Sequence, residues 1–295
     1  MDLNANTMDA LFTALNGSLN KGIAQAWNGW QKFSMVVNSN SSVERYPVML
    51  VQGTMREWVG ARVVHSLDGK TLDVRNRDYE HTEGVSRNDI EDDTIGLYSP
   101  LFEAMGVNAA NLWGMLATEA LCNPGNWADG AAFYKTDRQF GRATINNKVT
   151  GALSLSTYET ARARMLGFCD AAGSPLGLIP DLLVVGPALE GTAKQILKAD
   201  LTVSGGATVS NVHRDEAEIV VDPYMVGDHA NKWFLICTTR GIRPIAVQKR
   251  KEGALVRWDS DSDLCVKEHN RNDYGLHFRG AAAAVGPHLV IGGNL

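Results

Sequence analysis

A long run of polar residues between positions 47 and 90 constrains the fold of this chain more than any other feature. Two strand-like runs, 55–67 and 71–90, flank Asp68-Gly69-Lys70, and an Asp-Gly pair between such runs is typical of a hairpin turn. Each arm would be about ten residues or longer, against a usual ~5–6. The charged residues spread over both arms are Arg56, Glu57, Arg62, Lys70, Asp73, Arg75, Arg77, Asp78 and Glu80.

An isolated two-stranded ribbon is only marginally stable in water. This one has little apolar surface with which to fold back onto its own chain. We therefore expect residues 50–90 to be held by an adjoining copy of the chain, whose surface would carry matching charges.

Residues 94–123 predict a long helix after this polar hairpin. Ser99-Pro100 is a plausible N-cap and first helical residue, and Asp93 is a competing cap one turn earlier. Gly106 and Gly114 suggest a bend or the close approach of another backbone, because glycine is unfavourable inside a helix. From residue 99 to 121 the helix would span roughly 33 Å. The residues that approximate its apolar stripe are Leu97, Leu101, Met105, Ala109, Leu112 and Leu116.

Between the predicted hairpin and the predicted helix lie four carboxylates, Asp89, Glu91, Asp92 and Asp93. An EF-hand loop that began at Asp89 would need glycine at its sixth position and glutamate at its twelfth, where this chain has Thr94 and Pro100. Carboxylates ahead of a helix N-terminus are stabilised by the helix dipole. We interpret the cluster as a hinge, with Asp92, Asp93 and Ser99 as candidate helix-capping residues, rather than a metal or catalytic site.

A second lobe begins near residue 156. Residues 156–173 predict an amphipathic helix, 180–187 a buried strand and 188–200 a further helix. Strand-like runs follow at 216–225, 232–239 and 242–251. This order indicates a mixed sheet with helices packed on it, and the chain as a whole is predicted to be α+β.

Composition and motifs exclude several classes of protein. With a net charge of -5, the chain lacks the excess of basic residues that is typical of a dedicated nucleic-acid-binding protein. The N-terminus has no signal-peptide pattern and no run is apolar enough to span a membrane, so we expect a cytosolic protein without membrane contact. The templates GxSxG, HExxH, GxGxxG and CxxC are all missing, and we predict neither catalytic nor metal nor cofactor residues. Four scattered cysteines predict reduced, mostly buried thiols.

Several short segments of the sequence resemble segments of one family, the major head (capsid) proteins of Mu-like phages and prophages. They are "FSMVVNSNSS", "MREWVG", "GVSRNDIEDDTIGLYSPLFEAMG", "GATVSN" and "RPIAVQKRK". The resemblance runs from about residue 33 to about 250 and is densest between 54 and 106.

This resemblance implies the Hong Kong 97-type capsid fold of tailed phages, an α+β fold. It divides the chain into an N-terminal arm, an extended loop hairpin, a long spine helix with the peripheral domain, an axial domain, and a return to the peripheral domain. The corresponding ranges are 1–45, 46–92, 93–150, 151–239 and 240–295.

The implied function is self-assembly. Hexamers and pentamers would form an icosahedral head shell around double-stranded DNA, which the inner surface would meet without reading its sequence. The implied partners are further copies of the chain, a separate scaffolding protein and a portal protein, with a maturation protease and a decoration protein as additional candidates. The protein would assemble in the host bacterial cytoplasm and end in the virion. The residues expected to form intersubunit contacts in the extended loop are Arg56, Glu57, Trp58, Arg62, Lys70 and Arg75.

Two alternatives remain open from the sequence. An encapsulin-like cargo shell would share the fold but would hold a protein cargo instead of DNA. An α/β enzyme with an unrecognised site is the other. Bound cofactor, or a monomer that persists at high concentration, would favour the enzyme.

Overall fold

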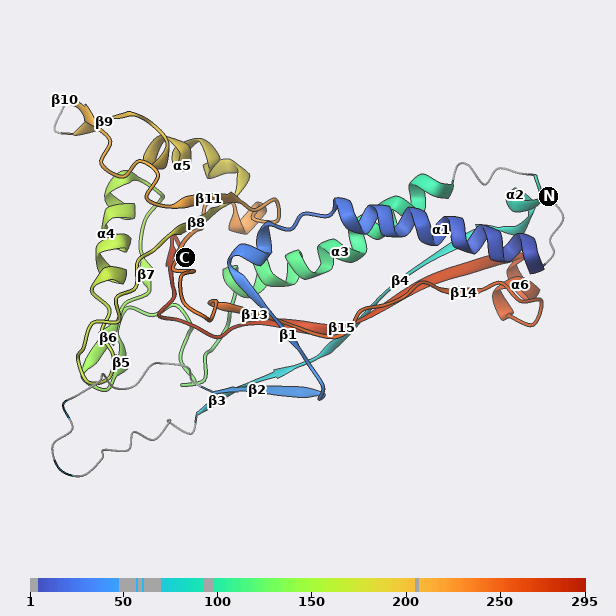
Figure 1. The fold of residues 1–295 in the computed structure, drawn as a ribbon, viewed down its shortest axis with the longest axis horizontal. Coiled ribbons are helices and arrows are strands. Elements are labelled where there is room, and N and C mark those ends of the chain that lie inside the picture. The colour runs from blue at the N-terminus through green and yellow to red at the C-terminus, as the bar shows by residue number, and fades with distance from the viewer. Residues whose placement is uncertain (1–4, 48–56, 58–59, 61–69, 93–97, 205–206) are drawn as a thin grey trace.

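Two β-sheets follow one another along the long axis of the molecule (Figure 1). The computed structural model describes the whole chain except residues 1–4, 48–56, 58–59, 61–69, 93–97 and 205–206. The first sheet contains β1 (Ser34–Asn38), β13 (Ile245–Lys251), β15 (Arg271–Ala284), β14 (Val256–Trp258) and β4 (Arg77–Ser86). The second contains, in spatial order, β11 (Glu218–Val221), β8 (Leu182–Val185), β12 (Trp233–Ile236), β16 (Val290–Gly293) and β7 (Lys148–Val149).

The long strand β15 is the axis of the first sheet. Strand β4 pairs with it antiparallel over its full length, from Ser86 opposite Arg271 to Arg77 opposite Gly280. On the other edge of β15 lie β13 and β14, and β1 pairs parallel to β13. The sheet therefore joins segments that are far apart in the sequence.

This pairing corrects one prediction. Residues 71–90 were expected to depend on another copy of the chain, but β4 forms a ten-residue ladder with β15 of the same chain. The strand before it, β3 (Thr71–Arg75), pairs antiparallel with β2 (Val43–Pro47). Backbone hydrogen bonds along a ladder do not require apolar side chains, so a polar strand can join its own sheet. The predicted turn at residues 68–69 lies outside the described residues.

Two long helices pack against each other and against one face of the first sheet (Figure 1). They are α1 (Ala5–Gln25) and α3 (Tyr98–Cys122). A Cβ atom on Gly106 would lie 2.1 Å from the carbonyl oxygen of Leu19, so only glycine allows the two backbones to approach this closely. The close approach predicted at Gly106 is thus confirmed. The α1 side chains buried by this contact are Leu11, Leu15 and Leu19.

The start of α3 differs from the prediction. Ser99 is already helical, since α3 begins at Tyr98, so it is not the N-cap. Asp92 follows a short helix that the sequence did not predict, α2 (Arg87–Glu91), and lies at its C-terminal end. The competing cap, Asp93, lies outside the described residues. The hinge interpretation of Asp92 therefore remains, but its proposed role as the cap of the long helix is wrong.

The second sheet carries the predicted helices of the second lobe. Helix α4 (Leu155–Leu166) starts at a capping box formed by Ser154 and Thr157. Strand β8 is buried throughout, and α5 (Glu190–Leu197) follows it as expected. The remaining elements are η1 (Gly29–Lys32), β5 (Arg138–Phe140), β6 (Ala143–Ile145), η3 (Pro187–Leu189), β9 (Leu201–Ser204), β10 (Ala207–Ser210), η4 (Gly227–His229) and α6 (Leu264–His269).

The last strand lies in the second sheet. Within residues 240–295, strands β13, β14 and β15 belong to the first sheet, whereas β16 inserts between β12 and β7 of the second. Its sequence, Val-Ile-Gly-Gly, is buried at every position. Gly293 must be glycine, because a Cβ there would lie 1.9 Å from the Trp233 ring. The C-terminal segment therefore joins the two sheets.

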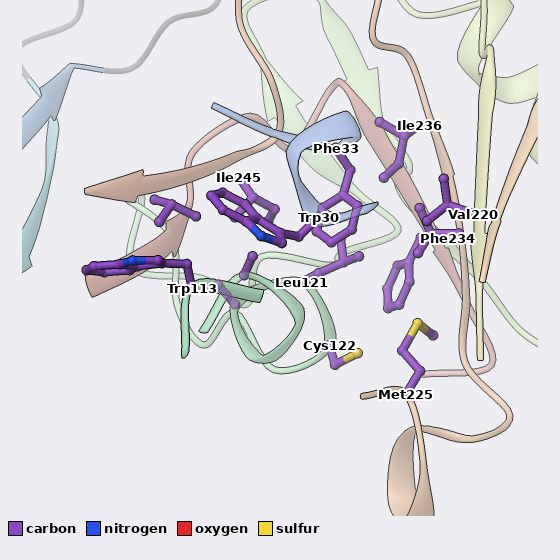
Figure 2. Packing of buried hydrophobic residues seen from close by; sticks show 14 of the residues in the cluster. Trp30, Phe33, Trp113, Leu121, Cys122, Val220, Met225, Phe234, Ile236 and Ile245 are labelled. Atoms are coloured by element: carbon purple, nitrogen blue, oxygen red, sulfur yellow. The ribbon is translucent and has the colours of Figure 1, made fainter. Parts of the chain in front are cut away.

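An apolar core fills the junction between the two sheets (Figure 2). Leu121 near the end of α3 and Phe234 of β12 are fully buried there. Polar contact is limited, but the hydroxyl of Thr118 donates to the carboxylate of buried Asp222 at 2.5 Å. Burial raises the pKa of that carboxyl. The core side chains labelled in Figure 2 are Trp30, Phe33, Trp113, Leu121, Cys122, Val220, Met225, Phe234, Ile236 and Ile245.

Candidate assembly surfaces

The antiparallel pair β2–β3, which we call the ribbon, flanks residues 48–70 in the sequence. Pro47 at the end of β2 lies directly opposite Thr71 at the start of β3. The residues that flank the 48–70 segment therefore lie side by side. In Figure 1 the ribbon extends beside the first sheet, on the side away from α1.

A buried hydrogen-bond network fixes the ribbon to the first sheet. Gln248 of β13 is fully buried, and its amide nitrogen donates to the carbonyl oxygen of Val74 at 3.1 Å and to Oδ1 of Asn76 at 2.8 Å. The hydroxyl of Tyr46 donates to Oε1 of Gln248 at 3.0 Å. Strands β2 and β3 are thus both bonded to one glutamine side chain. Since buried hydrogen bonds are directional, this network sets the orientation of the ribbon.

The network continues into the turn between β1 and β2. Asn76 donates from Nδ2 to the hydroxyl of Ser39 at 2.7 Å, and that hydroxyl donates to Glu44 at 2.8 Å. Hydrogen bonds from Ser39, and then from the backbone of Ser41 and Asn40, lower the pKa of the Glu44 carboxyl. Burial raises the pKa of Tyr46 to about 12. Both groups therefore keep one charge state near neutral pH, and the network does not change with small shifts in acidity.

Sequence reasoning did not find this network. The signal was present in the run Ile245-Ala246-Val247-Gln248, where a glutamine continues a buried apolar strand. A buried amide must find partners, but the sequence does not say which. Two of the partners, Tyr46 and Asn76, are more than 170 positions away.

The predicted contact residues fall into two groups. Arg56, Trp58 and Arg62 lie outside the described residues. Glu57 and Lys70 are exposed.

Arg75 ends β3 and is exposed beside the ribbon. Its neighbour across the ribbon is Val43. The nearest cross-strand ion pair joins Arg45 to Asp73 at 3.5 Å. The predicted roles of Glu57, Lys70 and Arg75 in contacts between subunits stay predictions.

The acidic hinge is tied to its surroundings by polar contacts. Tyr98, the first residue of α3, donates from its hydroxyl to the carboxylate of Asp89, and this hydrogen bond is the main cause that raises the tyrosine pKa to about 12. Arg87 pairs with Asp261 at 2.8 Å. Ile90 of α2 is fully buried. The hinge is therefore a folded corner of the molecule.

The N-terminal helix is held by its own chain as well. Arg257 of β14 pairs with Asp9 of α1 at 2.5 Å, and its guanidinium lies 5.0 Å from the centre of the Phe12 ring. Together with the packing of α1 on α3, this contact places the predicted arm against the body of its own subunit.

Within the described ranges, no three His, Cys, Asp or Glu side chains are placed to bind a metal ion. All four cysteines are free thiols, and Cys122 and Cys237 are buried. No described helix has both the length and the apolar character needed to cross a membrane.

Comparison with known proteins connects this architecture to one family. The profile of the Mu-like prophage major head subunit gpT matches residues 8–152, 139–225 and 225–289. The major capsid protein of Escherichia phage Mu is 25% identical over 299 residues, covering 74% of this chain and 98% of that protein. The Mu-like prophage FluMu major head subunit of Haemophilus influenzae is 29% identical over 134 residues, covering 45% of this chain and 44% of that protein.

The fold is shared with solved capsids. A chain from the procapsid of bacteriophage JBD30 superposes with a TM-score of 0.61 at 20% identity, covering 98% of this chain and 75% of that one. At this identity the likeness concerns the fold, and the family profile supplies the function. The chain therefore belongs to the Mu-like prophage major head subunit gpT family, and it is a major capsid protein with the Hong Kong 97-type fold.

Proposed function

We propose that this subunit builds an icosahedral head shell by forming hexamers and pentamers around double-stranded DNA, and that the ribbon carries the loop that joins neighbouring subunits. One observation supports the second part: the two ends of the 48–70 segment are paired at the same place, Pro47 opposite Thr71. A segment anchored in this way can extend from the subunit without disturbing its fold.

The proposed division of the chain follows the two sheets. The first sheet, with α3, would be the peripheral domain, and the second sheet, with α4 and α5, the axial domain at the centre of each hexamer or pentamer. Strand β16 would belong to the axial domain. The extended loop would be the ribbon with residues 48–70, shorter than the range 46–92 expected from the sequence, because β4 is part of the first sheet.

The intersubunit contacts are proposed to involve Arg56, Glu57, Trp58, Arg62, Lys70 and Arg75. Single exposed ion pairs contribute only ~0–1 kcal/mol each. Weak contacts allow a misplaced subunit to dissociate during assembly, and many of them together stabilise a closed shell.

Further partners follow from the role of a head subunit. A separate scaffolding protein and a portal protein would act during assembly, and a maturation protease or a decoration protein could act later. Packaged DNA would contact the inner surface through local lysine and arginine side chains, without readout of sequence. Membership of the gpT family favours a phage head over an encapsulin-like cargo shell.

A loop replacement tests the role of the ribbon. Residues 49–69 are replaced by Asn-Gly, which closes the two paired strand ends with a short turn. We expect a folded subunit with nearly unchanged thermal stability that forms no closed shells by negative-stain electron microscopy.

The matched control for this replacement is Lys267→Ala. It removes one exposed charge from α6, outside the proposed contact residues, and should assemble normally. Normal shells from the replacement variant would contradict the proposed role of the loop.

A further inference from the structure

A pocket of about 340 Å³ in the second lobe is lined by positive charges. Lys135 precedes β5, Lys148 lies in β7 and Arg164 lies in the last turn of α4. All three residues are half-buried, and no carboxylate is among the described residues that line the pocket. In Figure 1, α4 runs beside β7. The fold thus brings three cations from separate parts of the chain to one place.

The guanidinium of Arg164 is held in this pocket by neutral groups. Its Nη1 donates to the backbone carbonyl oxygen of Lys148 at 2.9 Å and to Oδ1 of Asn146 at 3.3 Å. The same oxygen of Asn146 accepts from the backbone nitrogen of Lys148 at 3.3 Å. These bonds fix the guanidinium against β7. Because both of its acceptors are uncharged, they leave its positive charge uncompensated.

The two lysines add charge that the described part of the chain compensates only weakly. Lys135 pairs with Asp137 at 3.4 Å, and that aspartate is exposed. Among the described residues, no ion pair joins Lys148 or Arg164 to a carboxylate. The helix dipole stabilises a cation at the C-terminal end of α4, which explains Arg164. It does not explain the two lysines, which lie outside that helix.

The arrangement of the three cations favours one class of ligand. A pocket lined by charges of one sign raises the local concentration of the opposite ion. A carboxylate presents its two oxygens in one plane, which suits a single guanidinium. A phosphate group directs its oxygens to the corners of a tetrahedron, so cations on different sides of the pocket can contact it together. The hydroxyls of Thr136 and Thr150 line the same pocket and can also donate.

We propose that the pocket formed by Lys135, Lys148 and Arg164 binds a phosphate group. Two sources present such a group, the backbone of double-stranded DNA and free phosphate. The pocket itself does not depend on the proposed function. Only the DNA source rests on it, since a head subunit meets DNA inside the shell.

Titration with inorganic phosphate tests the pocket. The full-length chain is titrated by calorimetry at constant ionic strength, with chloride as the replaced anion. We expect Lys148→Gln and Lys135→Gln each to weaken phosphate binding about tenfold, near the lower end of what one charge-assisted hydrogen bond contributes. The matched control, Lys267→Gln, removes one exposed charge from α6 and should leave phosphate binding unchanged.

A short DNA duplex of arbitrary sequence identifies the source of the phosphate group. Fluorescence anisotropy of a labelled duplex gives its affinity at several salt concentrations. If the DNA backbone occupies the pocket, each lysine variant should lower the slope of log affinity against log salt by about 1, and inorganic phosphate should compete with the duplex. A general loss of structure would not produce this change of slope in a folded variant. If the variants weaken phosphate binding but not duplex binding, the pocket is confirmed with free phosphate as its ligand.

The remaining outcomes overturn the inference. They are that the unaltered chain binds neither phosphate nor the duplex, or that both lysine variants bind them as the unaltered chain does. Circular dichroism shows whether each variant is folded, and the two lysines lie on different elements, so one variant can replace the other. Shell formation by the unaltered chain, seen by negative-stain microscopy, tests the proposed function separately.

Discussion

The apolar junction between the sheets and the polar anchor of the ribbon are both buried, yet they hold the molecule by different forces. At the junction, Phe234, Leu121 and Trp30 exclude water and need few hydrogen bonds (Figure 2). At the ribbon anchor, Gln248 and Tyr46 are buried as polar groups and bond to named partners. The junction therefore stabilises the fold, and the anchor fixes the orientation of the ribbon.

This difference suits a subunit that must be rigid and must still present a loop to its neighbours. Burial of apolar surface is favourable in many arrangements, because it has no preferred angle. A hydrogen bond contributes only about 0.5–1.5 kcal/mol net, but it fixes geometry. We therefore expect changes at the junction to lower the free energy of unfolding more than changes at the ribbon anchor.

The largest effect is expected at the junction. Phe234 is fully buried. Phe234→Ala should lower the free energy of unfolding by about 3–5 kcal/mol, through lost burial and the cavity that remains. Urea unfolding of the subunit measures this value.

Ile179→Ala is the matched control for Phe234→Ala. Its side chain is 56% exposed, and we expect a change within about 0.5 kcal/mol. If Phe234→Ala lowers the free energy of unfolding by less than the ribbon-anchor variants do, the expected order of the two regions is wrong.

The second-largest effect is expected at acid pH and should act through the buried side chain of His288. This histidine is 5% exposed, and burial, with a smaller contribution from Arg240, lowers its pKa to about 4. In the unfolded chain the pKa of a histidine is about 6.5. Between about pH 4 and pH 6.5 the unfolded state therefore binds a proton on His288 that the folded state does not bind. The resulting stability is complete above about pH 6.5 and is lost as the pH falls, by roughly 3 kcal/mol at pH 4.

Unfolding titrations from pH 7 to pH 4 check this expectation, and His288→Gln should reduce the slope of stability against pH over that window. The ribbon anchor offers the contrast, because neither Tyr46 nor Glu44 changes charge between about pH 5 and pH 8. If the slope is the same with and without His288, then another group causes the acid sensitivity.

The sequence predicted the parts of this molecule whose signal is local. The helix predicted at 156–173 and the buried strand predicted at 180–187 have local patterns, and both elements are present, although α4 already ends at Leu166. The partner of β4 could not be predicted, because its ten mostly polar residues pair with β15 about 200 positions away. Apolar periodicity carries no information about such a ladder.

The candidate site shows the same limit. A short segment such as "MREWVG" indicated the family, but the anchor of the ribbon depends on three side chains from separate parts of the chain, Tyr46, Asn76 and Gln248. Each of them alone is an unremarkable polar residue in the sequence. Their roles become visible only when the fold brings them together.

A smaller effect is expected at the centre of the ribbon anchor. Gln248→Leu keeps most of the buried volume but leaves the hydroxyl of Tyr46 and Oδ1 of Asn76 without this partner. We expect a loss of about 1–3 kcal/mol in the free energy of unfolding. Amide hydrogen exchange should also increase in β2 and β3 and remain unchanged in β8. Equal increases in both places would mean that the anchor contributes general stability and not direction.

The smallest effect is expected for Tyr46→Phe, which removes one hydroxyl and keeps the ring. Its hydrogen bond to Gln248 is 3.0 Å long and buried, so the loss should be about 0.5–1.5 kcal/mol. The double variant with Gln248→Leu completes a cycle.

If the two side chains act as one network, the double variant should lose less than the sum of the single losses, because either change already breaks the shared bond. Additive losses would contradict a shared network, and Tyr46 would then contribute to the ribbon as a member of the small buried apolar cluster that also contains Val74 and Ala246.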